Sequence, residues 1–528
     1  MDTKALQQKI LDLAIRGKLV PQDPNDEPAS VLLERIREQK QQMVKEGKLK
    51  KKDIKNDSVI FVGEDNLHYE KFQDGTVKCI EDEIPFELPE GWSWCRLLSL
   101  SIKIGAGSTP TGGAAVYTTS GIKFIRSQNV YDDGLVLDDV AYIPEEINQK
   151  KSGSIVKSKD ILLNITGGSI GRCALVSDDF DIANVNQHVM IIRLANLELR
   201  KYIHSVVISP YIQEQIISRQ VGSGRGGLSA ETLSTFLIPL PPLNEQVSIN
   251  RKLNECISQV LAIADAKCNI SNLIIATKAK ILDLAIRGKL VPQDPNDEPA
   301  SVLLERIRAE KEELIKQGKI KRDKKESVIF KGEDNSYYEK IGDRIMNIDD
   351  EIPFEVPDNW SWCRGYSCFK GIESTKPQGE FFDYIDIDSI DNRLHRIKKP
   401  KHLLVSDAPS RANRSVKNGS VLFSLVRPYL ENIALIEEKY SHCIASTGFY
   451  VCNSNGAFLP EFMFYLMISG YVVGGLNQYM KGDNSPSINK DNIEGWLYPI
   501  PPIKEQKKIF TKLQTVFAMI ESVEKGLN

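Results

Sequence analysis

The sequence lacks the features that would place it in a membrane, in the secretory pathway or among disulfide-bonded proteins. No apolar run reaches the roughly 20 residues that span a bilayer, and residues 1–10 are polar where a signal peptide would be apolar. The nine cysteines are odd in number and include no Cys-x-x-Cys pair, which indicates reduced thiols rather than a disulfide framework or a zinc site. We therefore expect a cytoplasmic protein.

Catalytic motifs are also missing. There is no G-x-x-x-x-G-K-[ST] phosphate loop, no H-E-x-x-H motif and no Asn- or Asp-Pro-Pro-aromatic motif of the kind expected in an adenine-amino methyltransferase. A G-x-G-x-x-G match at Gly222, Gly224 and Gly227 follows a helical stretch, so it lacks the strand-turn-helix context of a nucleotide site. We predict a chain with no catalytic residue, metal site or cofactor of its own.

An excess of positive charge is missing too. The net charge is −3 and the pI is about 6.2, whereas nucleic-acid binders usually carry a basic excess on at least one face. The basic run at residues 48–57 is interpreted as a solvated linker. An acidic row is expected to be exposed strand and turn carboxylates rather than metal ligands: Asp383, Asp386, Asp388 and Asp391. Any claim of DNA binding must therefore rest on local features.

What the sequence does contain is a duplication. Residues 9–37 recur without one change as residues 280–308, and such identity does not arise by chance. The chain must therefore be read as two halves. Further repeats relate 58–71 to 327–340, 82–96 to 350–364, and the segments PLPPLNEQ (239–246) and PIPPIKEQ (499–506) to each other.

The segments that recur in both halves of the chain predict helices. Residues 2–16 form one, and a second begins near Pro28 and stops at Gly47. After the paired prolines, apolar residues step by four and three, which predicts long helices with a heptad seam. The central helix is expected over 243–287, about 65 Å at 1.5 Å per residue. The seam residues are Ile249, Leu253, Cys256, Val260 and Ile263, then Ile270, Ile274, Thr277, Ile281 and Leu284, and in the C-terminal helix Ile509, Leu513, Val516, Ile520 and Val523.

The two repeats overlap in the middle of a helix. The central helix matches the C-terminal helix along its first part and the N-terminal helix along its last part. The chain thus resembles a closed ring opened at one point. We expect the intact helix to pack antiparallel against the split one, in a pseudo-two-fold molecule whose termini lie close together.

Between the conserved parts lie two divergent segments, residues 97–237 and 365–497, here called the first and second variable domains. Both contain short β-rich runs broken by Gly, Ser and Asn and later helical pieces, which predicts α+β domains of ordinary size. Each follows an entry strap, residues 82–96 or 350–364, whose Trp92, Trp94, Trp360 and Trp362 are expected to pack rather than stack on bases. The predicted division is 1–50, 51–237, 238–320, 321–497 and 498–528.

Polar, glycine-rich loops in the variable domains carry side chains suited to DNA. Arg pairs with guanine, Asn or Gln with adenine, and Ser, Thr or backbone amides with phosphate. The loops are 105–113, 125–129, 166–172, 184–188 and 222–229 in the first domain, and 374–380, 410–414, 426–432 and 480–487 in the second. The predicted DNA contacts are Ser108, Thr109, Arg126, Gln128, Asn129, Arg172, Asn186, Gln187 and Arg225, with Lys376, Arg411, Arg414, Arg427, Tyr429, Lys481, Asn484 and Ser485.

With these features the chain resembles the specificity subunit of a type I restriction-modification enzyme. The resemblance rests on the two variable domains, the helix entries IPLPPLNEQ and YPIPPIKEQ, the repeated LDLAIRGKLVPQ, and the straps IPFELPEGW and IPFEVPDNW. It covers nearly the whole chain.

The resemblance implies an α+β fold with two target recognition domains, each reading one half of a bipartite asymmetric DNA site, and antiparallel coiled-coil helices that set the gap. It also implies a non-catalytic chain. The expected partners are double-stranded DNA, two modification subunits that methylate adenine with S-adenosylmethionine, and restriction subunits that use ATP and Mg, with no membrane.

Two other functions stay open at this point. One is a protein-binding scaffold with two divergent ligand domains and no DNA, which a preference for any DNA sequence would exclude. The other is a stand-alone nucleotide-binding enzyme, which the misplaced glycine motif makes the weakest of the three.

Overall fold

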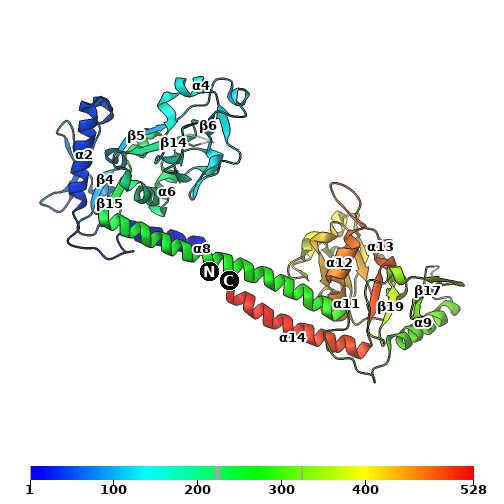
Figure 1. Ribbon diagram of the computed structural model, residues 1–528. Coiled ribbons are helices and arrows are strands. Elements are labelled where there is room, and N and C mark those ends of the chain that lie inside the picture. The colour runs from blue at the N-terminus through cyan, green and yellow to red at the C-terminus, as the bar shows by residue number, and fades with distance from the viewer. Residues whose placement is uncertain (1, 221–225, 321, 323–324, 528) are drawn as a thin grey trace. The chain divides into compact units, whose positions relative to one another are not determined.

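The computed structural model describes residues 2–220, 226–320, 322 and 325–527, and the chain divides into two compact units, Met1–Ala266 and Lys267–Asn528. Each unit combines a β-rich domain with long helical segments, so the predicted α+β class is confirmed (Figure 1). The elements of the two units correspond in order because the sequence repeat runs through both.

The first unit begins with two helices, α1 (Thr3–Ile15) and α2 (Ala29–Lys45), close to their predicted bounds. The Asp2 side chain caps α1 by accepting hydrogen bonds from the amides of Lys4 and Ala5. Gly17 ends the α1 region with a φ of +65°, and a Cβ there would lie 2.3 Å from the Pro89 ring. This close approach ties the end of α1 to the entry strap.

A small three-stranded meander and the entry strap follow. The meander consists of β1 (Ser58–Val62), β2 (His68–Phe72) and β3 (Val77–Cys79), and the strap leads into β4 (Ser93–Arg96), which pairs with β15 (Leu237–Leu240). Trp92 and Trp94 are buried, and Trp94 meets Phe86 edge-to-face with ring centroids 5.0 Å apart. The predicted packing role of these tryptophans is confirmed.

The first variable domain is built on two four-stranded sheets with orders β12-β11-β14-β5 and β10-β13-β6-β9. Strands β6 and β13 pair in parallel, and the other ladders are antiparallel. The strands are β5 (Ser101–Ala106), β6 (Ile122–Ile125), β7 (Val130–Tyr131), β8 (Gly134–Leu135), β9 (Ala141–Ile143), β10 (Ile155–Val156), β11 (Ile161–Asn164), β12 (Cys173–Leu175), β13 (Ala183–Val185) and β14 (Val189–Leu194). The helices are α3 (Leu97–Leu100), α4 (Glu145–Lys150), α5 (Arg200–Val207), α6 (Pro210–Ser218) and α7 (Ala230–Ser234).

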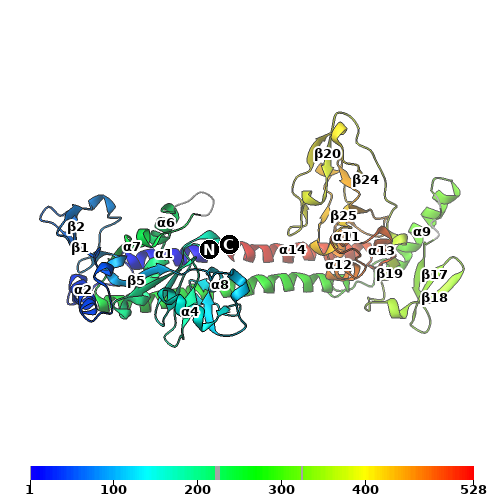
Figure 2. The same cartoon turned by 90° about the horizontal axis from the view of Figure 1, so that it is seen from above.

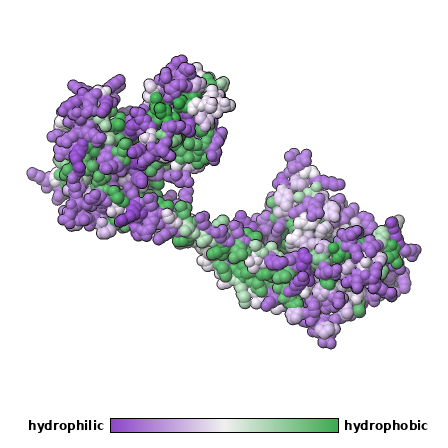
Figure 3. All heavy atoms as spheres, viewed as in Figure 1, coloured by the Kyte–Doolittle hydropathy of each residue, from purple (hydrophilic) through white to green (hydrophobic). Residues whose placement is uncertain are grey.

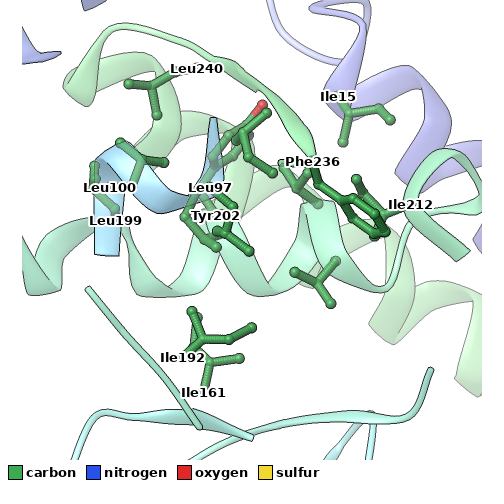
Figure 4. Packing of buried hydrophobic residues seen from close by; sticks show 14 of the residues in the cluster. Ile15, Leu97, Leu100, Ile161, Ile192, Leu199, Tyr202, Ile212, Phe236 and Leu240 are labelled. Atoms are coloured by element: carbon green, nitrogen blue, oxygen red, sulfur yellow. The ribbon is translucent and has the colours of Figure 1, made fainter. Parts of the chain in front are cut away.

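One apolar core joins this domain to the helices of its unit. Ile161 and Ile192, on neighbouring strands β11 and β14, face Tyr202 of α5, and Ile15 of α1 and Ile212 of α6 belong to the same buried cluster (Figure 4). Burial of such side chains contributes about 1.5 to 3 kcal/mol each. The helices therefore share one core with this face of the variable domain, whose opposite face has a separate buried cluster.

The second unit repeats this plan. Its elements are α9 (Ala300–Lys316), β16 (Val328–Lys331), β17 (Tyr337–Ile341), β18 (Arg344–Asn347), β19 (Ser361–Arg364), α10 (Gly365–Cys368), β20 (Phe381–Ile385), β21 (Ile390–Asp391), β22 (Arg396–Ile397), β23 (Lys401–Leu404), β24 (Ala412–Ser415), β25 (Val421–Ser424), β26 (Ile433–Leu435), β27 (Ile444–Ser446), β28 (Phe449–Cys452), α11 (Pro460–Met467), α12 (Gly470–Asn477), α13 (Lys490–Gly495) and β29 (Leu497–Ile500). The sheets of its variable domain have the orders β23-β20-β27-β24 and β26-β25-β28. Trp362 packs on Phe354 as Trp94 packs on Phe86.

The long helices occur as predicted: α8 spans Leu243–Ile286 and α14 spans Ile503–Leu527. In the first unit, Ile249 and Leu253 of α8 belong to the buried cluster that contains Ile10 and Leu11 of α1. In the second, Leu282 and Ile286 of α8 share a cluster with α14, which runs alongside this part of α8 in both views (Figures 1 and 2).

The helices of each pair run in opposite directions. Gln22, after the end of α1, donates to Glu245 at the start of α8, and Lys278 of α8 pairs with Glu524 near the end of α14. The first unit thus pairs α1 with the first part of α8. The second unit pairs α14 with the last part of α8, and both pairs are antiparallel.

The predicted seam is wrong at several positions in the middle of α8, although Ile274 is buried as predicted. Ile263 and Ile270 are 42% and 38% exposed and Thr277 is exposed, while Leu282 and Ala285 are buried in place of the half-buried Leu284. In the first unit the reason is length, since the 13 residues of α1 cover only about 20 Å of α8. The seam is confirmed at Ile249, Leu253, Val260 and Ile274 of α8 and at Ile509 and Leu513 of α14, and it is wrong at Val523, which is exposed.

Among the described helices, α8 alone is long and apolar enough to cross a membrane by length and composition. Its two ends pack against α1 and α14 inside their units.

Candidate nucleic-acid interface

In the first variable domain the predicted loops converge at one end of the strands. The amide of Gly107 donates to Asn186 O over 3.2 Å, and the amide of Asn186 donates to Ile125 O over 3.2 Å. Asn164 Nδ2 donates to Ser127 O over 2.8 Å. Loops 105–113, 125–129, 166–172 and 184–188, far apart in the sequence, therefore form one surface. Residues 226–229 join it through the bond from the Leu228 amide to Ile165 O, 2.9 Å.

Glycine is required where two of these loops touch. A Cβ on Gly107 would lie 1.8 Å from Val185 O, so no other residue fits without moving the backbone. This contact fixes the loop after β5 against the turn between β13 and β14. It sets where Ser108 and Thr109 stand relative to Gln187.

A chain of polar side chains crosses the surface. Gln187 Oε1 accepts from the Thr109 amide over 3.1 Å, and Gln187 Nε2 lies 3.1 Å from His188 Nε2. The other ring nitrogen of His188 lies 2.5 Å from Thr166 Oγ1. Thr109 and Gln187 are exposed, so this array presents oriented hydrogen-bonding groups to a ligand.

Cationic side chains border the same loops. The Arg172 guanidinium lies over the Tyr131 ring at 4.7 Å, and Arg126 Nη2 donates to Asp139 O over 2.9 Å. Lys151 Nζ donates to Ser108 Oγ over 2.5 Å. Two arginines and a lysine thus border the surface, and Arg126 also pairs with the Asp139 carboxylate over 3.6 Å. The predicted residue Gln128 is exposed and donates to Asp139 Oδ2.

Two of the predicted contacts of this domain are buried, and a third lies outside the described residues. Asn129 is 2% exposed, and its amide group accepts from the Arg126 amide and donates to Val136 O, so it shapes its own turn. Asn186 is buried and accepts from the His188 amide in the same manner. Arg225 lies outside the described residues, as do Gly222 and Gly224. Gly227 forms a bridge with Thr166, after helix α6, in a setting unlike that of a nucleotide fingerprint.

The loops of the second variable domain also meet. Thr447, between β27 and β28, donates its amide to Arg411 O over 2.8 Å, and Gly448 O accepts from the Leu425 amide over 2.8 Å. Loop 374–380 reaches loop 410–414 through the bond from the Thr375 amide to Asn413 O, 3.1 Å. Loop 480–487 joins through the bond from the Arg427 amide to Pro486 O, 2.7 Å. Residues 447–448 therefore connect all four loops.

The loop that carries Arg427 is conformationally constrained. Arg427 and Glu431 both have left-handed backbones, with φ of +48° and +54°, which non-glycine residues rarely adopt. Arg427 Nη2 donates to Asn484 O over 2.9 Å, and Tyr429 is exposed between the two strained residues. The backbone of Lys481 pairs with Ser487. Of the remaining predicted contacts, Lys376, Arg411 and Ser485 are exposed and Arg414 is half-buried.

The two surfaces occupy equivalent places on equivalent frames. The turn after β13 corresponds to the turn after β27, and the turn between β11 and β12 corresponds to that between β25 and β26. The side chains differ: Gln187 and His188 stand where the second domain has Thr447 and Gly448. Lys151, His188 and Thr447 were not predicted, because a helix-end lysine, a single histidine and a threonine carry no motif.

Comparison with known proteins gives the family. The model of the type I restriction modification DNA specificity domain matches residues 89–269 and 372–528. The specificity subunit of the type I restriction enzyme EcoAI from Escherichia coli is 27% identical, covering 97% of this chain and 88% of that protein. The EcoEI specificity subunit from the same species is 26% identical, covering 99% and 90%.

A solved structure supports the fold. A chain from a structural study of complex assembly and conformational transition of the type I R-M system superposes with a TM-score of 0.52, at 17% identity, and covers 84% of this chain and 94% of that one. The protein described here belongs to the type I restriction-modification DNA specificity family. It is the non-catalytic DNA specificity subunit with two recognition domains, and the cofactors of the enzyme belong to the modification and restriction subunits.

Proposed function

We propose that each variable domain reads one half of a bipartite, asymmetric DNA site through the surface described above. The observation that carries this proposal is a pair of equivalent loop surfaces with unlike side chains. A shared scaffold with different base-reading groups is what recognition of two unrelated half-sites requires.

The proposed contacts are chosen by chemistry and, for the described residues, because their side chains are exposed or half-buried. In the first domain they are Ser108, Thr109, Arg126, Gln128, Arg172, Gln187 and Arg225, and in the second Lys376, Arg411, Arg414, Arg427, Tyr429, Lys481, Asn484 and Ser485. Lys151 and His188 are added because both hydrogen-bond within the first surface. Asn129 and Asn186 are assigned to holding turns, because their amides are buried and engaged.

We further propose that the helices set the gap between the half-sites. The α1–α8 and α8–α14 pairs are antiparallel within their units, which supports an antiparallel coiled coil built from an intact and a split helix. The corresponding contacts Gln22–Glu245 and Gln293–Glu505 support the pseudo-two-fold, circular organisation. A stiff spacer favours one DNA spacing, because others require the DNA to bend or twist.

The helices also offer surface for partners. In the second unit Ile270, Leu273 and Ile275 of α8 and Met519 and Val523 of α14 are exposed, and apolar residues reach the surface of this helical part in Figure 3. Exposed apolar clusters on a protein surface mark interaction sites. We propose that two modification subunits dock on the helices, with restriction subunits completing a cytoplasmic complex.

The proposed division of the chain into domains is 1–50, 51–237, 238–320, 321–497 and 498–528.

Methylation-sensitive sequencing tests this function. DNA from a host that carries this chain with its modification partner should show a two-part asymmetric motif methylated at adenine on both strands. Exchanging residues 97–237 for those of a relative should change only one half of the motif, and exchanging 365–497 should change only the other. An active complex that produces no motif, or one half that depends on both domains, would instead favour the protein-binding scaffold.

A further inference from the structure

Four potential metal ligands meet in the second variable domain. Asp383 lies on β20, His402 lies on β23, and His442 and Cys443 directly precede β27. The sheet brings them together, because Asp383 and His402 are cross-strand partners and Tyr384 pairs with Ile444 in the parallel β20–β27 ladder. The residues before that pair, Asp383 and Cys443, therefore lie side by side on one face.

The distances between the ligand atoms are short. Asp383 Oδ1 lies 2.8 Å from His402 Nδ1, and its Oδ2 lies 2.8 Å from His442 Nε2. Cys443 Sγ lies 3.9 Å from His442 Nε2, and the ligand atoms of Asp383, His442 and Cys443 all lie within 4.8 Å of one another. In a tetrahedral zinc site, bonds of about 2.0 to 2.3 Å place ligand atoms about 3 to 4 Å apart. His402 is not part of this three-residue group, so its imidazole must turn toward the other three side chains to become a fourth ligand.

The surroundings suit a site that is rigid on one side and open on the other. Cys443 is 3% exposed and belongs to the apolar cluster beneath the sheet, so its position is fixed by packing. The side chains of His402 and His442 are 66% and 60% exposed, so a cation can enter from solvent. The Phe381 ring stacks on the His402 ring at 5.0 Å and 8°, which orients the imidazole.

We propose that Asp383, His442 and Cys443, with His402 turned toward them as the fourth ligand, form a tetrahedral site for a divalent cation of the zinc class. One carboxylate, two imidazoles and one thiolate supply the oxygen, nitrogen and sulfur ligands that zinc accepts, whereas magnesium and calcium prefer oxygen alone. The site joins β23, β20 and β27 by a link other than backbone hydrogen bonds. Its role is structural, because all four positions are taken by protein ligands.

The first variable domain supplies an internal comparison. The strands β6, β9 and β13 correspond to β20, β23 and β27, and the equivalent positions hold Lys123, Tyr142, Ile182 and Ala183. Lys123 pairs there with Asp181 over 2.7 Å. The four ligands are thus not part of the common scaffold. They belong to the second domain, whose strand β27 leads directly into residues 447–448 of its loop surface.

The test uses the untagged full-length chain, because a polyhistidine tag would bind the same cations. After chelation and dialysis, cobalt(II) is added and the absorption spectrum recorded, then zinc content is measured after dialysis against zinc. We expect about one cation per chain, tetrahedral d–d bands and a sulfur-to-cobalt charge-transfer band. Cys443→Ser should lose the charge-transfer band, and the double variant His402→Gln/His442→Gln should bind at least about 10-fold more weakly. The histidine variants are exposed, so they test the site without disturbing the core.

Cys79→Ser is the matched control, because Cys79 is an exposed thiol in the first unit and its loss should change nothing. Zinc should also slow hydrogen exchange in β20, β23 and β27 but not in β6, β9 and β13. The proposal is overturned if the wild-type chain retains no more zinc than the double histidine variant. It is equally overturned if the charge-transfer band survives in Cys443→Ser. In either case the cluster is a carboxylate that accepts hydrogen bonds from two imidazoles.

Discussion

The indole Nε1 of Trp92 donates a hydrogen bond to Oε2 of Glu245 over 2.8 Å in the interior of the first unit. The other oxygen of the same carboxylate accepts from Gln22 Nε2 over 3.1 Å. Burial raises the pKa of Glu245. One side chain at the start of α8 thus holds both the entry strap and the segment after α1. In the second unit Glu505 accepts from Gln293 over 2.8 Å.

Glu245→Leu should destabilise the first unit, because the buried Trp92 indole would be left without an acceptor, whereas Gln22 keeps its bond to Gly17 O. Each unsatisfied buried donor costs about 1 to 3 kcal/mol. Glu245→Gln keeps an acceptor and should cost less. Urea unfolding combined with hydrogen exchange resolved by unit would measure this. Glu505→Leu should have a smaller effect in the second unit, because there the carboxylate accepts from Gln293, which also donates to Gly288 O. Equal stability of the Leu and Gln variants would show that these hydrogen bonds contribute nothing net.

Arg172→Ala should change recognition of one half-site only. If the guanidinium contacts a base, its loss costs about 1 to 3 kcal/mol and relaxes one position. If it contacts phosphate, binding weakens for all sequences and the salt dependence decreases. Arg427→Ala should act in the same way on the other half. Selection of bound sequences by the assembled complex measures both, with Lys252→Ala on α8 as the control, and an effect of Arg172→Ala on both halves would contradict the assignment.

A heptad inserted in α8 between Lys267 and Cys268 should shift or abolish the preferred gap between half-sites. Seven residues lengthen the helix by about 10 Å, which corresponds to roughly 3 base pairs at 3.4 Å each. Methylated motifs in cells that express the variant would report the spacing. The same seven residues inserted after Asn56, in the linker beyond α2, should leave it unchanged. A normal spacing in the α8 variant would refute the spacer role.

The first unit should lose stability in mild acid because of His204. Burial lowers the pKa of this imidazole, whose Nε2 hydrogen-bonds to Cys173 O over 2.8 Å, so the folded state keeps it neutral. The unfolded chain takes up a proton near pH 6.5. The stability is therefore present above pH 6.5 and is lost as the pH falls toward the folded pKa, by up to about 1.4 kcal/mol per pH unit.

The substitution His204→Phe provides the control for this pH effect, because Phe464 of α11 stands at the equivalent position in the second unit. The second unit has an acid-sensitive group of its own, since burial also lowers the pKa of His395. Unfolding measured against pH should therefore show the acid-dependent loss in the first unit and its reduction in His204→Phe. A variant with the same slope as the wild type would assign the pH dependence to another group.

The circular organisation predicts that the two termini lie close together. Labels at residues 2 and 527, in a chain whose exposed thiols Cys79 and Cys268 have been replaced, would report the distance. Efficient energy transfer is expected both in the free chain and in the complex. A large separation in the assembled complex would defeat the ring model.

The long helices could be predicted closely from the sequence. Residues 243–287 were expected and Leu243–Ile286 are observed, because paired prolines mark the start and the heptad pattern is local. The two-sheet arrangement of each variable domain was not predicted. Strands such as β6 and β13 are very short and pair across some sixty residues of chain, so no local pattern reveals their register.

The loop surfaces could be predicted as loops but only partly as residues. Glycine among polar side chains identified segments that the structure brings together. A side-chain amide can hydrogen-bond within a turn as well as to a base, however. The sequence therefore does not distinguish the buried Asn129 and Asn186 from exposed DNA contacts. Asp383, His402 and His442 lie on or beside three strands, and only the register of those strands brings them together.

The identity of residues 9–37 and 280–308 has a consequence at the level of the gene. Where the codons also match, homologous recombination between the two copies would delete everything between them in frame. The shortened product would carry α1, α9, the second variable domain and α14. Since α1 corresponds to the last part of α8, it could take that place against α14 and leave a complete, compact unit. One crossover would thus convert a chain with two different target recognition domains into a chain with only one.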